Sequence, residues 1–350
     1  MPREHGGGEA MVDDGGPIRV GVCWDDLAAS PEQLGRIAAA SRANPIIWDG
    51  EAPAPDVEVL IADDVPDVIP REMPHLRLLQ LISAGVDTLH GHPVWRSDVA
   101  IATAAGVHGV QIAEHVFMLL LALRRHLPSY VEAQRRHEWA HDRPAEGELY
   151  GLTLGLIGYG HIGRGVAHLA RAFGMRVLAT SASVREAAPL AISGASPFVD
   201  PPAVPVPGHA PDQLLPLAHL HDVLAQSDAL VICAALTPQT TGMIDANALA
   251  HMKHGSYLVN IARGKIVEEA ALVQALRDGR LAGAGLDVTA EEPLPGDHPL
   301  WELPNVIITP HISGKSRHYV ERTVNVLLAN LDHLRRGEAP LTAVDRQRGY

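Results

Sequence analysis

The chain has 350 residues, of which 47% are hydrophobic and 20% are charged, and its formal net charge is -13. This length is sufficient for about two domains, each with its own core. The acidic charge argues against a nucleic-acid-binding protein, because a phosphate backbone requires clustered Lys and Arg. No apolar run approaches the roughly 18 residues that a membrane-spanning helix requires, so we expect no membrane partner either.

The N-terminal residues 1–17 lack the apolar segment of a secretory signal, and we expect a disordered tail. The two cysteines, Cys23 and Cys233, both lie in apolar runs of strand type. Buried free thiols in a reducing compartment explain them most simply, which predicts a cytoplasmic protein.

Short apolar runs and one helical segment follow the tail and predict a small parallel α/β unit. The expected strands lie at 18–24, 56–62, 76–82 and 99–103, and the expected helix lies at 31–40. The loop 83–87 follows one of these strands directly. Because open α/β sheets bind ligands beyond the carboxyl ends of their strands, this loop is a candidate substrate contact, with a simple turn as the alternative.

Residues 109–125 predict a long helix that is apolar on nearly every side, so we expect it to be buried and to link two domains or line an interface. Shortly after it, residues 137–141 match the H-E-x-x-H zinc-peptidase motif with His137 and His141. That motif requires both histidines on one face of a helix. Because Pro144 would end a helix here, we interpret the match as chance and expect no metal.

An apolar run at 153–158 ends in a G-x-G-x-x-G motif formed by Gly158, Gly160 and Gly163, and a helical segment follows at 161–173. Gly158 would make the tight turn, Gly160 would let the backbone approach a pyrophosphate, and Gly163 would let helix and strand pack closely. The phosphates would lie on the unpaired amides of the helix N-terminus. This stretch therefore predicts a dinucleotide-binding site.

The next strand, at 175–179, lacks a following carboxylate of the kind that binds the ribose 2′-hydroxyl of NAD. Ser181, Ser183 and Arg185 stand there instead. Hydroxyls with a nearby Arg suit a 2′-phosphate, which favours NADP over NAD, with a simply solvated Arg185 as the alternative. Residues 197–216 contain seven prolines and predict a surface loop.

The remaining strands lead into polar loops. The expected strands lie at 229–233, 256–260, 283–287 and 306–309, after a short helix at 217–225. The first ends before Leu236 and Thr237, where a loop would cover the nicotinamide ribose. The other three end before Arg263, the acids Glu291 and Glu292, and His311. Each alone could be structural, but together they lie where a doubly wound sheet places its active site.

These segments resemble the D-isomer-specific 2-hydroxyacid dehydrogenases. The matching stretches are GLIGYGHIG, LTPQT, VNIARG, GLDVTAEEPLP and TPHISG, with AEH in the long helix and SAGVD in the first α/β unit. The spacing agrees as well, because Arg263, Asp287 and His311 follow one another at intervals of 24 residues. The ending, at 344–350, is similar to that of the glyoxylate/hydroxypyruvate reductase branch, which favours NADPH.

The resemblance implies an α/β fold of two domains, with a doubly wound Rossmann NAD(P)-binding domain inserted in a flavodoxin-like substrate domain. The substrate domain would span 18–108, the Rossmann domain 109–311, and a C-terminal return to the substrate domain 312–350. The long helix would then support a homodimer.

The resemblance also implies an oxidoreductase that reduces a small 2-oxo acid of the glyoxylate or hydroxypyruvate type to the D-2-hydroxy acid. His311 would be the general acid/base, Glu292 would orient it, and Arg263 would hold the substrate carboxylate. The amides of Ala84, Gly85 and Val86 would share that carboxylate, and Asp287 would bind the nicotinamide carboxamide. The expected cofactor contacts are Gly158, Tyr159, Gly160, His161, Ile162, Gly163, Ser181, Ser183, Arg185, Leu236, Thr237, Ile261, Ala262, Arg263, Asp287, His311, Ser313 and Gly314.

Two positions depart from the family pattern. His108 stands where many members carry Asn and would face the substrate, and Lys315 stands where a smaller residue is common. Glu292 argues against formate, because the formate dehydrogenases of this family carry Gln at that position. The alternatives are a nucleotide-sensing, corepressor-like binding protein and a phosphite dehydrogenase.

Overall fold

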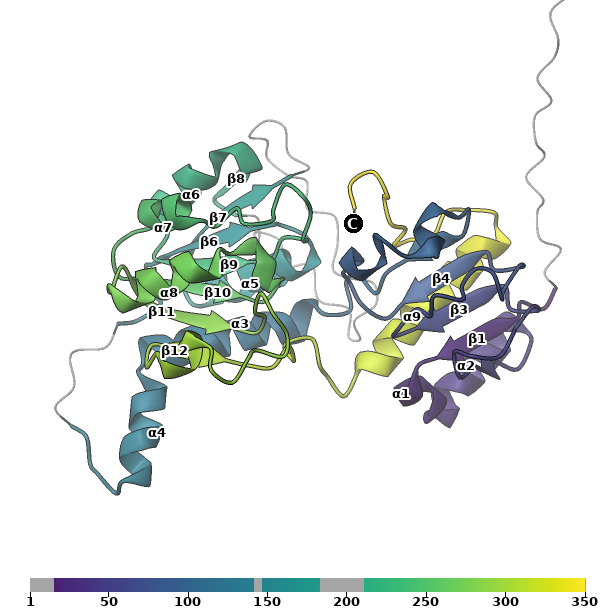
Figure 1. The fold of residues 1–350 in the computed structure, drawn as a ribbon, viewed down its shortest axis with the longest axis horizontal. Coiled ribbons are helices and arrows are strands. Elements are labelled where there is room, and N and C mark those ends of the chain that lie inside the picture. The colour runs from purple at the N-terminus through teal and green to yellow at the C-terminus, as the bar shows by residue number, and fades with distance from the viewer. Residues whose placement is uncertain (1–15, 142–146, 183–210, 350) are drawn as a thin grey trace, which may run out of the picture. The chain divides into compact units, whose positions relative to one another are not determined.

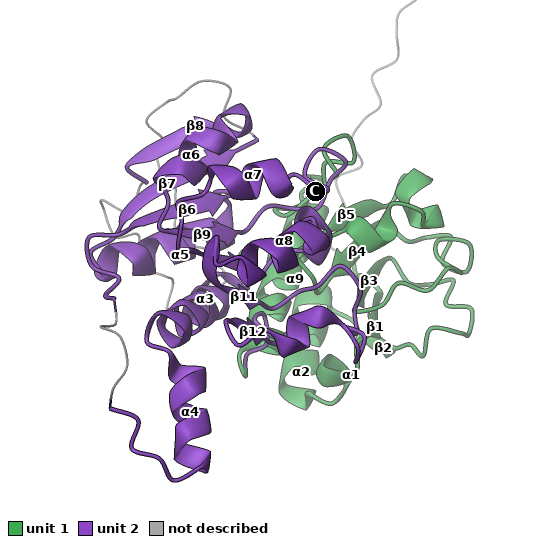
Figure 2. Cartoon of the chain, turned by 60° about the vertical axis from the view of Figure 1, so that its left-hand side comes forward, with its two compact units in different colours: residues 1–107, 198–200, 317–350 green, residues 108–197, 201–316 purple. Residues whose placement is uncertain are grey.

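The computed structural model describes residues 16–141, 147–182 and 211–349, which form two compact units (Figure 2). Unit 1 contains the described residues up to Val107 and those from Arg317 onward, and unit 2 contains those from His108 to Ser316. The core of each unit is one parallel β-sheet.

The sheet of unit 1 has five parallel strands in the order β2-β1-β3-β4-β5 (Figure 1). They are β1 (Val20–Cys23), β2 (Ile46–Ile47), β3 (Val59–Ala62), β4 (Leu78–Leu81) and β5 (Ala100–Ala102). This is the flavodoxin-like order. Strands β3 and β4 are buried along their whole length, which explains why their sequences are almost continuously apolar.

The C-terminal helix α9 (Tyr319–Arg335) completes the core of unit 1. It packs on one face of the sheet together with α1 (Asp25–Ala28) and α2 (Pro31–Ser41). Its Asn330 side chain donates a buried 2.7 Å hydrogen bond to the Gln80 side chain of β4. Segments that include the short 3-10 helices η1 (Asp87–Leu89) and η2 (Pro93–Arg96) form the second core cluster of unit 1.

The sheet of unit 2 has seven parallel strands in the order β12-β11-β10-β9-β6-β7-β8. They are β6 (Thr153–Ile157), β7 (Arg176–Ser181), β8 (Gln213–Pro216), β9 (Ala229–Ile232), β10 (Ser256–Asn260), β11 (Leu281–Leu286) and β12 (Val306–Ile308). The chain builds outward from β6 to β8 and then crosses to β9 on the other side of β6. The carboxyl ends of β6 and β9 therefore form the switch point where such sheets bind ligands.

Helices cover both faces of this sheet, as a doubly wound fold requires. Helices α3 (Gly109–Arg124) and α5 (His161–Ala172) contribute to one core cluster. Helices α6 (Leu220–Gln226), α7 (Ala246–His251) and α8 (Glu269–Arg277) contribute to the other, with the 3-10 helices η3 (Leu217–His219), η4 (Gly264–Ile266) and η5 (Pro299–Glu302) near them in the chain. Helix α4 (Leu127–Arg135) projects away from the sheet (Figures 1 and 2).

The α/β architecture with a Rossmann domain is confirmed. The units divide after Val107 and after Ser316, whereas the sequence suggested divisions after His108 and after His311. The expectation of a surface loop over 197–216 was wrong at its end, because Gln213–Pro216 forms strand β8 beside β7. An edge strand tolerates a proline that lacks an amide hydrogen, and β8 is such an edge. The rest of that stretch up to 210, like residues 1–15, lies outside the described residues.

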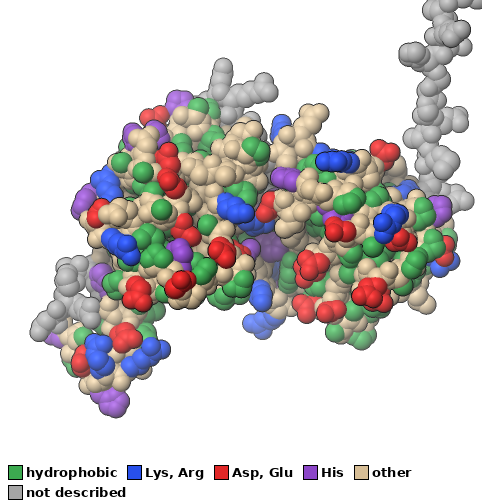
Figure 3. Space-filling model, viewed as in Figure 1, with side chains coloured by type: hydrophobic (Ala, Val, Ile, Leu, Met, Phe, Trp, Pro, Cys, Tyr) green, Lys and Arg blue, Asp and Glu red, His purple; other side chains and the backbone are tan. Residues whose placement is uncertain are grey.

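Both cysteines are free, and each is half-buried rather than fully buried as expected. The helices among the described residues are all too short or too polar to cross a bilayer. On the face shown in Figure 3, acidic and basic side chains are interspersed over both units.

Candidate active site

The three motif glycines follow β6, and each has a different environment. Gly158 has a φ of +94°, and a Cβ atom added there would lie 2.8 Å from the backbone nitrogen of Ala234. A Cβ atom added at Gly163 would lie 2.4 Å from the carbonyl oxygen of Gly158. A Cβ atom added at Gly160 would meet nothing within 4 Å. Gly158 and Gly163 are therefore required by packing, whereas the backbone at Gly160 faces open space.

This geometry fits a dinucleotide cofactor. Ala234 follows β9, so the close approach of Gly158 to Ala234 occurs at the switch point of the sheet. Gly160 is the N-cap of α5, and the amides of His161 and Ile162 belong to the first turn of that helix, where amides lack intrahelical acceptors. An open glycine beside such amides can accommodate a phosphate.

Three further expected cofactor residues lie at or after the carboxyl ends of β7 and β9. Ser181 is the last residue of β7, and Ser183 and Arg185 lie outside the described residues. Thr237 is buried after β9, and its amide donates a 2.8 Å hydrogen bond to the Thr240 hydroxyl, while Leu236 is half-buried beside it.

The loop after β10 is fixed by the last residue of that strand. The Asn260 side-chain amide donates to the carbonyl of Arg263 at 3.0 Å, and the Asn260 side-chain oxygen accepts from the amide of Ala262 at 3.1 Å. Ile261 and Ala262 are buried, whereas the Arg263 side chain is only partly buried. The buried amide of Asn260 thus sets the backbone that presents the Arg263 guanidinium.

Gly264 brings this loop against the loop after β11. A Cβ atom added at Gly264 would lie 1.9 Å from the backbone carbon of Thr289, so only glycine permits the approach. The Thr289 amide donates to one oxygen of Glu292 at 3.1 Å. Arg263 and Glu292 are therefore presented by two loops in direct contact.

His311 follows β12, and its ring contacts the carboxylate of Glu292. Its Nδ1 lies 2.8 Å from the second oxygen of Glu292, and both side chains are partly exposed. The backbone of His311 has a φ of 52°, in the left-handed region that non-glycine residues rarely adopt. An imidazole with one nitrogen on a carboxylate and the other available is the arrangement that general acid/base catalysis uses.

Asp287 organises the loop that carries His311. It is only 2% exposed, and its carboxylate accepts hydrogen bonds from the Thr309 hydroxyl at 2.6 Å and from the amides of Ile312 and Ser313 at 3.0 and 2.9 Å. Burial acts to raise the pKa of Asp287, but the hydrogen bonds from Ser313, Thr309 and Ile312 outweigh burial and hold that pKa below its ordinary value. The carboxylate therefore stays ionised inside unit 2.

His108 is buried and contacts the same loop. A Cβ atom added at Gly314 would lie 3.1 Å from the His108 ring, and the Gln111 side chain donates to the carbonyl of Gly314 at 3.0 Å. Lys315, the next residue, is exposed. The structure therefore brings His108 and Gly314 together in unit 2.

The remaining expected substrate residues lie in unit 1. Ala84, Gly85 and Val86 follow β4, and the Ser83 hydroxyl donates to the carbonyl of Gly85 at 2.8 Å. This turn is at the carboxyl end of the unit 1 sheet, as the sequence predicted.

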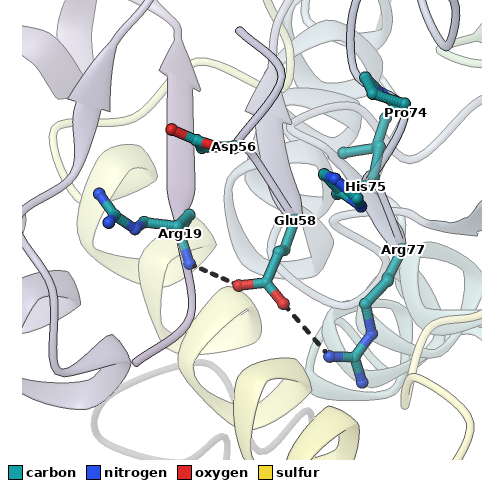
Figure 4. A pocket seen from close by; sticks show the side chains of 7 residues that line it. Arg19, Asp56, Glu58, Pro74, His75 and Arg77 are labelled. Carbon is teal, nitrogen blue, oxygen red and sulfur yellow. Dashed lines mark hydrogen bonds and ion pairs between the residues drawn. The ribbon is translucent and has the colours of Figure 1, made fainter. Parts of the chain in front are cut away.

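A surface pocket in unit 1 lies at the opposite end of the strands (Figure 4). Arg19, Glu58 and Arg77 each directly precede a strand. The Glu58 carboxylate accepts from the backbone amide of Arg19 at 3.0 Å and from the Arg77 guanidinium at 3.4 Å. These contacts join the amino ends of three parallel strands, so we interpret the pocket as a structural feature.

The zinc-peptidase match has no helix to support it. Helix α4 ends at Arg135, and His137, with a φ of 59°, breaks the helical path before His141. In the part of the chain that the structure describes, no group of three or more potential ligands could hold a metal ion.

Several contributing residues were not singled out from the sequence. The matching stretches TPHISG, AEH, VNIARG and GLDVTAEEPLP already contain Thr309, His115, Asn260 and Thr289, so the sequence carried a signal for each. Their hydrogen bonds, such as those of Asn260 and Thr289 within their own loops, are not revealed by any spacing pattern.

Comparison with known proteins identifies the family of the chain. Residues 117–313 match the family model described as D-isomer specific 2-hydroxyacid dehydrogenase, NAD binding domain. The chain is 32% identical over 320 residues to a glyoxylate reductase of Pyrococcus furiosus, covering 86% of this chain and 89% of the relative. It is 33% identical over 279 residues to a glycerate dehydrogenase of Methylorubrum extorquens, covering 75% and 77%.

A solved structure extends the similarity to the fold. A D-isomer specific 2-hydroxyacid dehydrogenase from Xanthobacter autotrophicus Py2, in complex with NADPH and MES, has a TM-score of 0.77 and 27% identity, with 96% of this chain and all of that chain covered.

Proposed function

Because the chain belongs to the D-isomer-specific 2-hydroxyacid dehydrogenase family, we propose that it reduces a small 2-oxo acid of the glyoxylate or hydroxypyruvate type to the D-2-hydroxy acid. The observation that carries this proposal is the 2.8 Å contact of His311 with Glu292, at the same end of the sheet as the glycine loop. A relative named glyoxylate reductase and one named glycerate dehydrogenase support the substrate class.

His311 is the acid/base residue in this proposal. Its Nδ1 is directed to Glu292, so Nε2 is the atom that would donate a proton to the carbonyl oxygen and retrieve it in the reverse reaction. The Glu292 carboxylate would balance the positive imidazolium and fix the ring orientation. When bound, the nicotinamide cofactor supplies the hydride.

Two groups of residues are proposed to hold the substrate carboxylate. The Arg263 guanidinium has the planar geometry that pairs with two carboxylate oxygens. The amides of Ala84, Gly85 and Val86 would add hydrogen bonds from a strand end of unit 1. His108 and Lys315 are proposed to influence which 2-oxo acid is accepted.

We also propose that the cofactor is NADP rather than NAD. The described residues at the end of β7 are Thr180, Ser181 and Ala182, which include no carboxylate for a ribose 2′-hydroxyl. The solved structure from Xanthobacter autotrophicus contains NADPH, which supports the same preference.

The test is an assay of purified protein with NADPH and NADH, each against glyoxylate, hydroxypyruvate, pyruvate and branched 2-oxo acids. We expect oxidation of the cofactor with at least one of these acids, and faster turnover with NADPH. Tight cofactor binding without turnover would instead favour the corepressor-like protein. A separate assay with phosphite and NAD+ or NADP+ tests the phosphite dehydrogenase: reduction of the oxidised cofactor by phosphite, without turnover of any 2-oxo acid, would favour that alternative.

A further inference from the structure

His115 lies on α3 and reaches the loop that carries His311. Its Nε2 is 2.9 Å from the hydroxyl of Thr309 and 3.7 Å from the nearer oxygen of Asp287. Thr309 directly follows β12, and its hydroxyl lies 2.6 Å from that same Asp287 oxygen. The three side chains thus form one hydrogen-bonded chain from α3 to the end of β11.

The number of protons available on the side chains of His115, Thr309 and Asp287 fixes the direction of each hydrogen bond among them. An ionised carboxylate only accepts, so the single hydroxyl proton of Thr309 is donated to Asp287. The Thr309 oxygen is then an acceptor toward His115, and Nε2 of His115 must be the protonated nitrogen. The contacts therefore require a proton on Nε2, and in a neutral His115 ring they leave Nδ1 unprotonated.

Asp287 connects this chain to the catalytic loop. Besides the hydrogen bond from the Thr309 hydroxyl, its carboxylate accepts hydrogen bonds from the backbone amides of Ile312 and Ser313. Its backbone carbonyl accepts a hydrogen bond from the amide of His311 at 2.8 Å. The backbone of His311 has a left-handed conformation, which persists only where neighbouring contacts enforce it. Those contacts come mainly from Asp287.

We propose that His115 is a positioning residue for His311: its neutral ring donates from Nε2 to Thr309, which directs the Thr309 hydroxyl to Asp287 and so fixes the loop at 310–313. This inference rests on the proposed function for its effect on turnover.

The surroundings of His115 agree with a neutral ring. Burial lowers the pKa of His115, and the Asp287 carboxylate, which is the one charged group facing the ring among the described residues, opposes burial only in part.

Paired variants test the proposal through turnover. Thr309→Val removes the hydroxyl at nearly constant volume, and Thr309→Ser retains it. His115→Leu removes the donor, and His115→Gln places an amide donor near the position of Nε2. We expect the Val and Leu variants to lower kcat about 10- to 100-fold while the KM for the 2-oxo acid changes little, because a loosened loop misplaces His311. Thr309→Ser and His115→Gln should retain most of the wild-type kcat.

Thr323→Val is the matched control, because the Thr323 hydroxyl on α9 is buried and has no hydrogen-bond partner among the described residues. It should retain wild-type kcat. Fluorescence titration with NADPH and thermal unfolding of every variant separate a misplaced loop from lost cofactor binding or lost folding. Equal kcat in Thr309→Val and Thr309→Ser, or a loss of kcat explained by unfolding alone, would overturn the proposal.

A second readout needs no turnover. Nitrogen NMR of the histidine rings, with His115 assigned by its absence in His115→Gln, reports which ring nitrogen carries the proton. We expect the neutral His115 ring with its proton on Nε2 at pH 7. A ring protonated only on Nδ1, or a cationic ring, would refute the proposed hydrogen-bond chain. If wild-type protein turned over no 2-oxo acid, the proposed function would fail and this spectrum would still decide the hydrogen-bond chain.

Discussion

His311 is held at both its backbone and its ring. Asp287 and the loop amides fix its backbone, and Glu292 fixes its imidazole at 2.8 Å. Neither contact depends on the glycine loop after β6, so the acid/base group and that loop can be altered separately.

This separation predicts the behaviour of His311→Ala. The variant should lose nearly all turnover, because general acid catalysis contributes roughly 100- to 10,000-fold. Its NADPH affinity, measured by fluorescence titration, should stay within about threefold of wild type, since no backbone contact of the loop is removed. Retained turnover, or loss of cofactor binding equal to the loss of turnover, would exclude His311 as the acid/base residue.

Sequence reasoning identified residues better than it identified their contacts. Arg263, Glu292 and His311 follow apolar strands, so their common location could be predicted. Nothing in the spacing indicated that the Asp287 carboxylate binds the amides of Ile312 and Ser313, because such contacts depend on a loop from the next strand. The role of Asp287 toward the nicotinamide stays a prediction.

Asp287 should make the stability of unit 2 depend on pH. Its pKa in the folded chain lies below the ordinary value of about 3.9, so ionised Asp287 stabilises the fold above that value, and this stability is lost as pH falls through the lower folded pKa. We expect Asp287→Asn to reduce the free energy of unfolding by about 2 kcal/mol at pH 7, because two backbone donors lose a charged acceptor.

Urea unfolding of wild type and Asp287→Asn at pH 7 and at pH 3 checks this prediction. The difference between the two proteins should shrink at pH 3, because this pH lies below the ordinary carboxyl pKa of about 3.9, so the unfolded wild-type chain takes up a proton at Asp287 that the folded chain binds less readily. A difference that is the same at both pH values would show that Asp287 acts through its shape and not through its charge.

The glycine loop provides a matched pair of substitutions. Gly158→Ala should destabilise the protein, because φ is +94° and the new methyl group would contact the backbone of Ala234. Gly160→Ala should leave the unfolding temperature nearly unchanged, because the added atom meets nothing within 4 Å, but it should weaken NADPH binding by about tenfold or more. Thermal unfolding and cofactor titration measure both effects. Unchanged NADPH affinity in Gly160→Ala would contradict the cofactor site.

The extent of the elements was predictable where the apolar pattern was long. Strands β6, β9 and β10 and helices α3 and α5 match their expected ranges closely because each is a continuous or periodic apolar segment. Strand β8 was not predicted, since local proline content dominated the interpretation and pairing with β7 supplies its stability. Helix α4 was also not predicted, because its apolar residues are few.

The homodimer stays a prediction, and unit 2 offers a surface for it. Helices α3 and α4 expose the apolar side chains of Met118, Leu121, Leu127 and Val131. We expect light scattering to report twice the chain mass, and Met118→Glu to shift the protein toward the monomer. Ile47→Glu, which changes an exposed apolar residue of unit 1, is the control. A wild-type monomer would contradict the prediction.

The two-unit organisation has a simple origin in the chain. Unit 1 is completed only when α9 supplies Leu327 and Leu331 to its core, after the whole of unit 2 has been traversed. The family resemblance implied this return of the C-terminal residues to the substrate domain.

Isotope transfer is the most direct test of hydride transfer to a 2-oxo acid by this protein. Reduction of hydroxypyruvate or glyoxylate with NADPH deuterated at the transferring position should place deuterium on C2 of the 2-hydroxy acid, with the D configuration wherever C2 is a stereocentre. His311→Ala should give almost none of this product under the same conditions. Cofactor that binds wild-type protein but leaves no deuterium on any 2-oxo acid of the panel would contradict the proposed reaction.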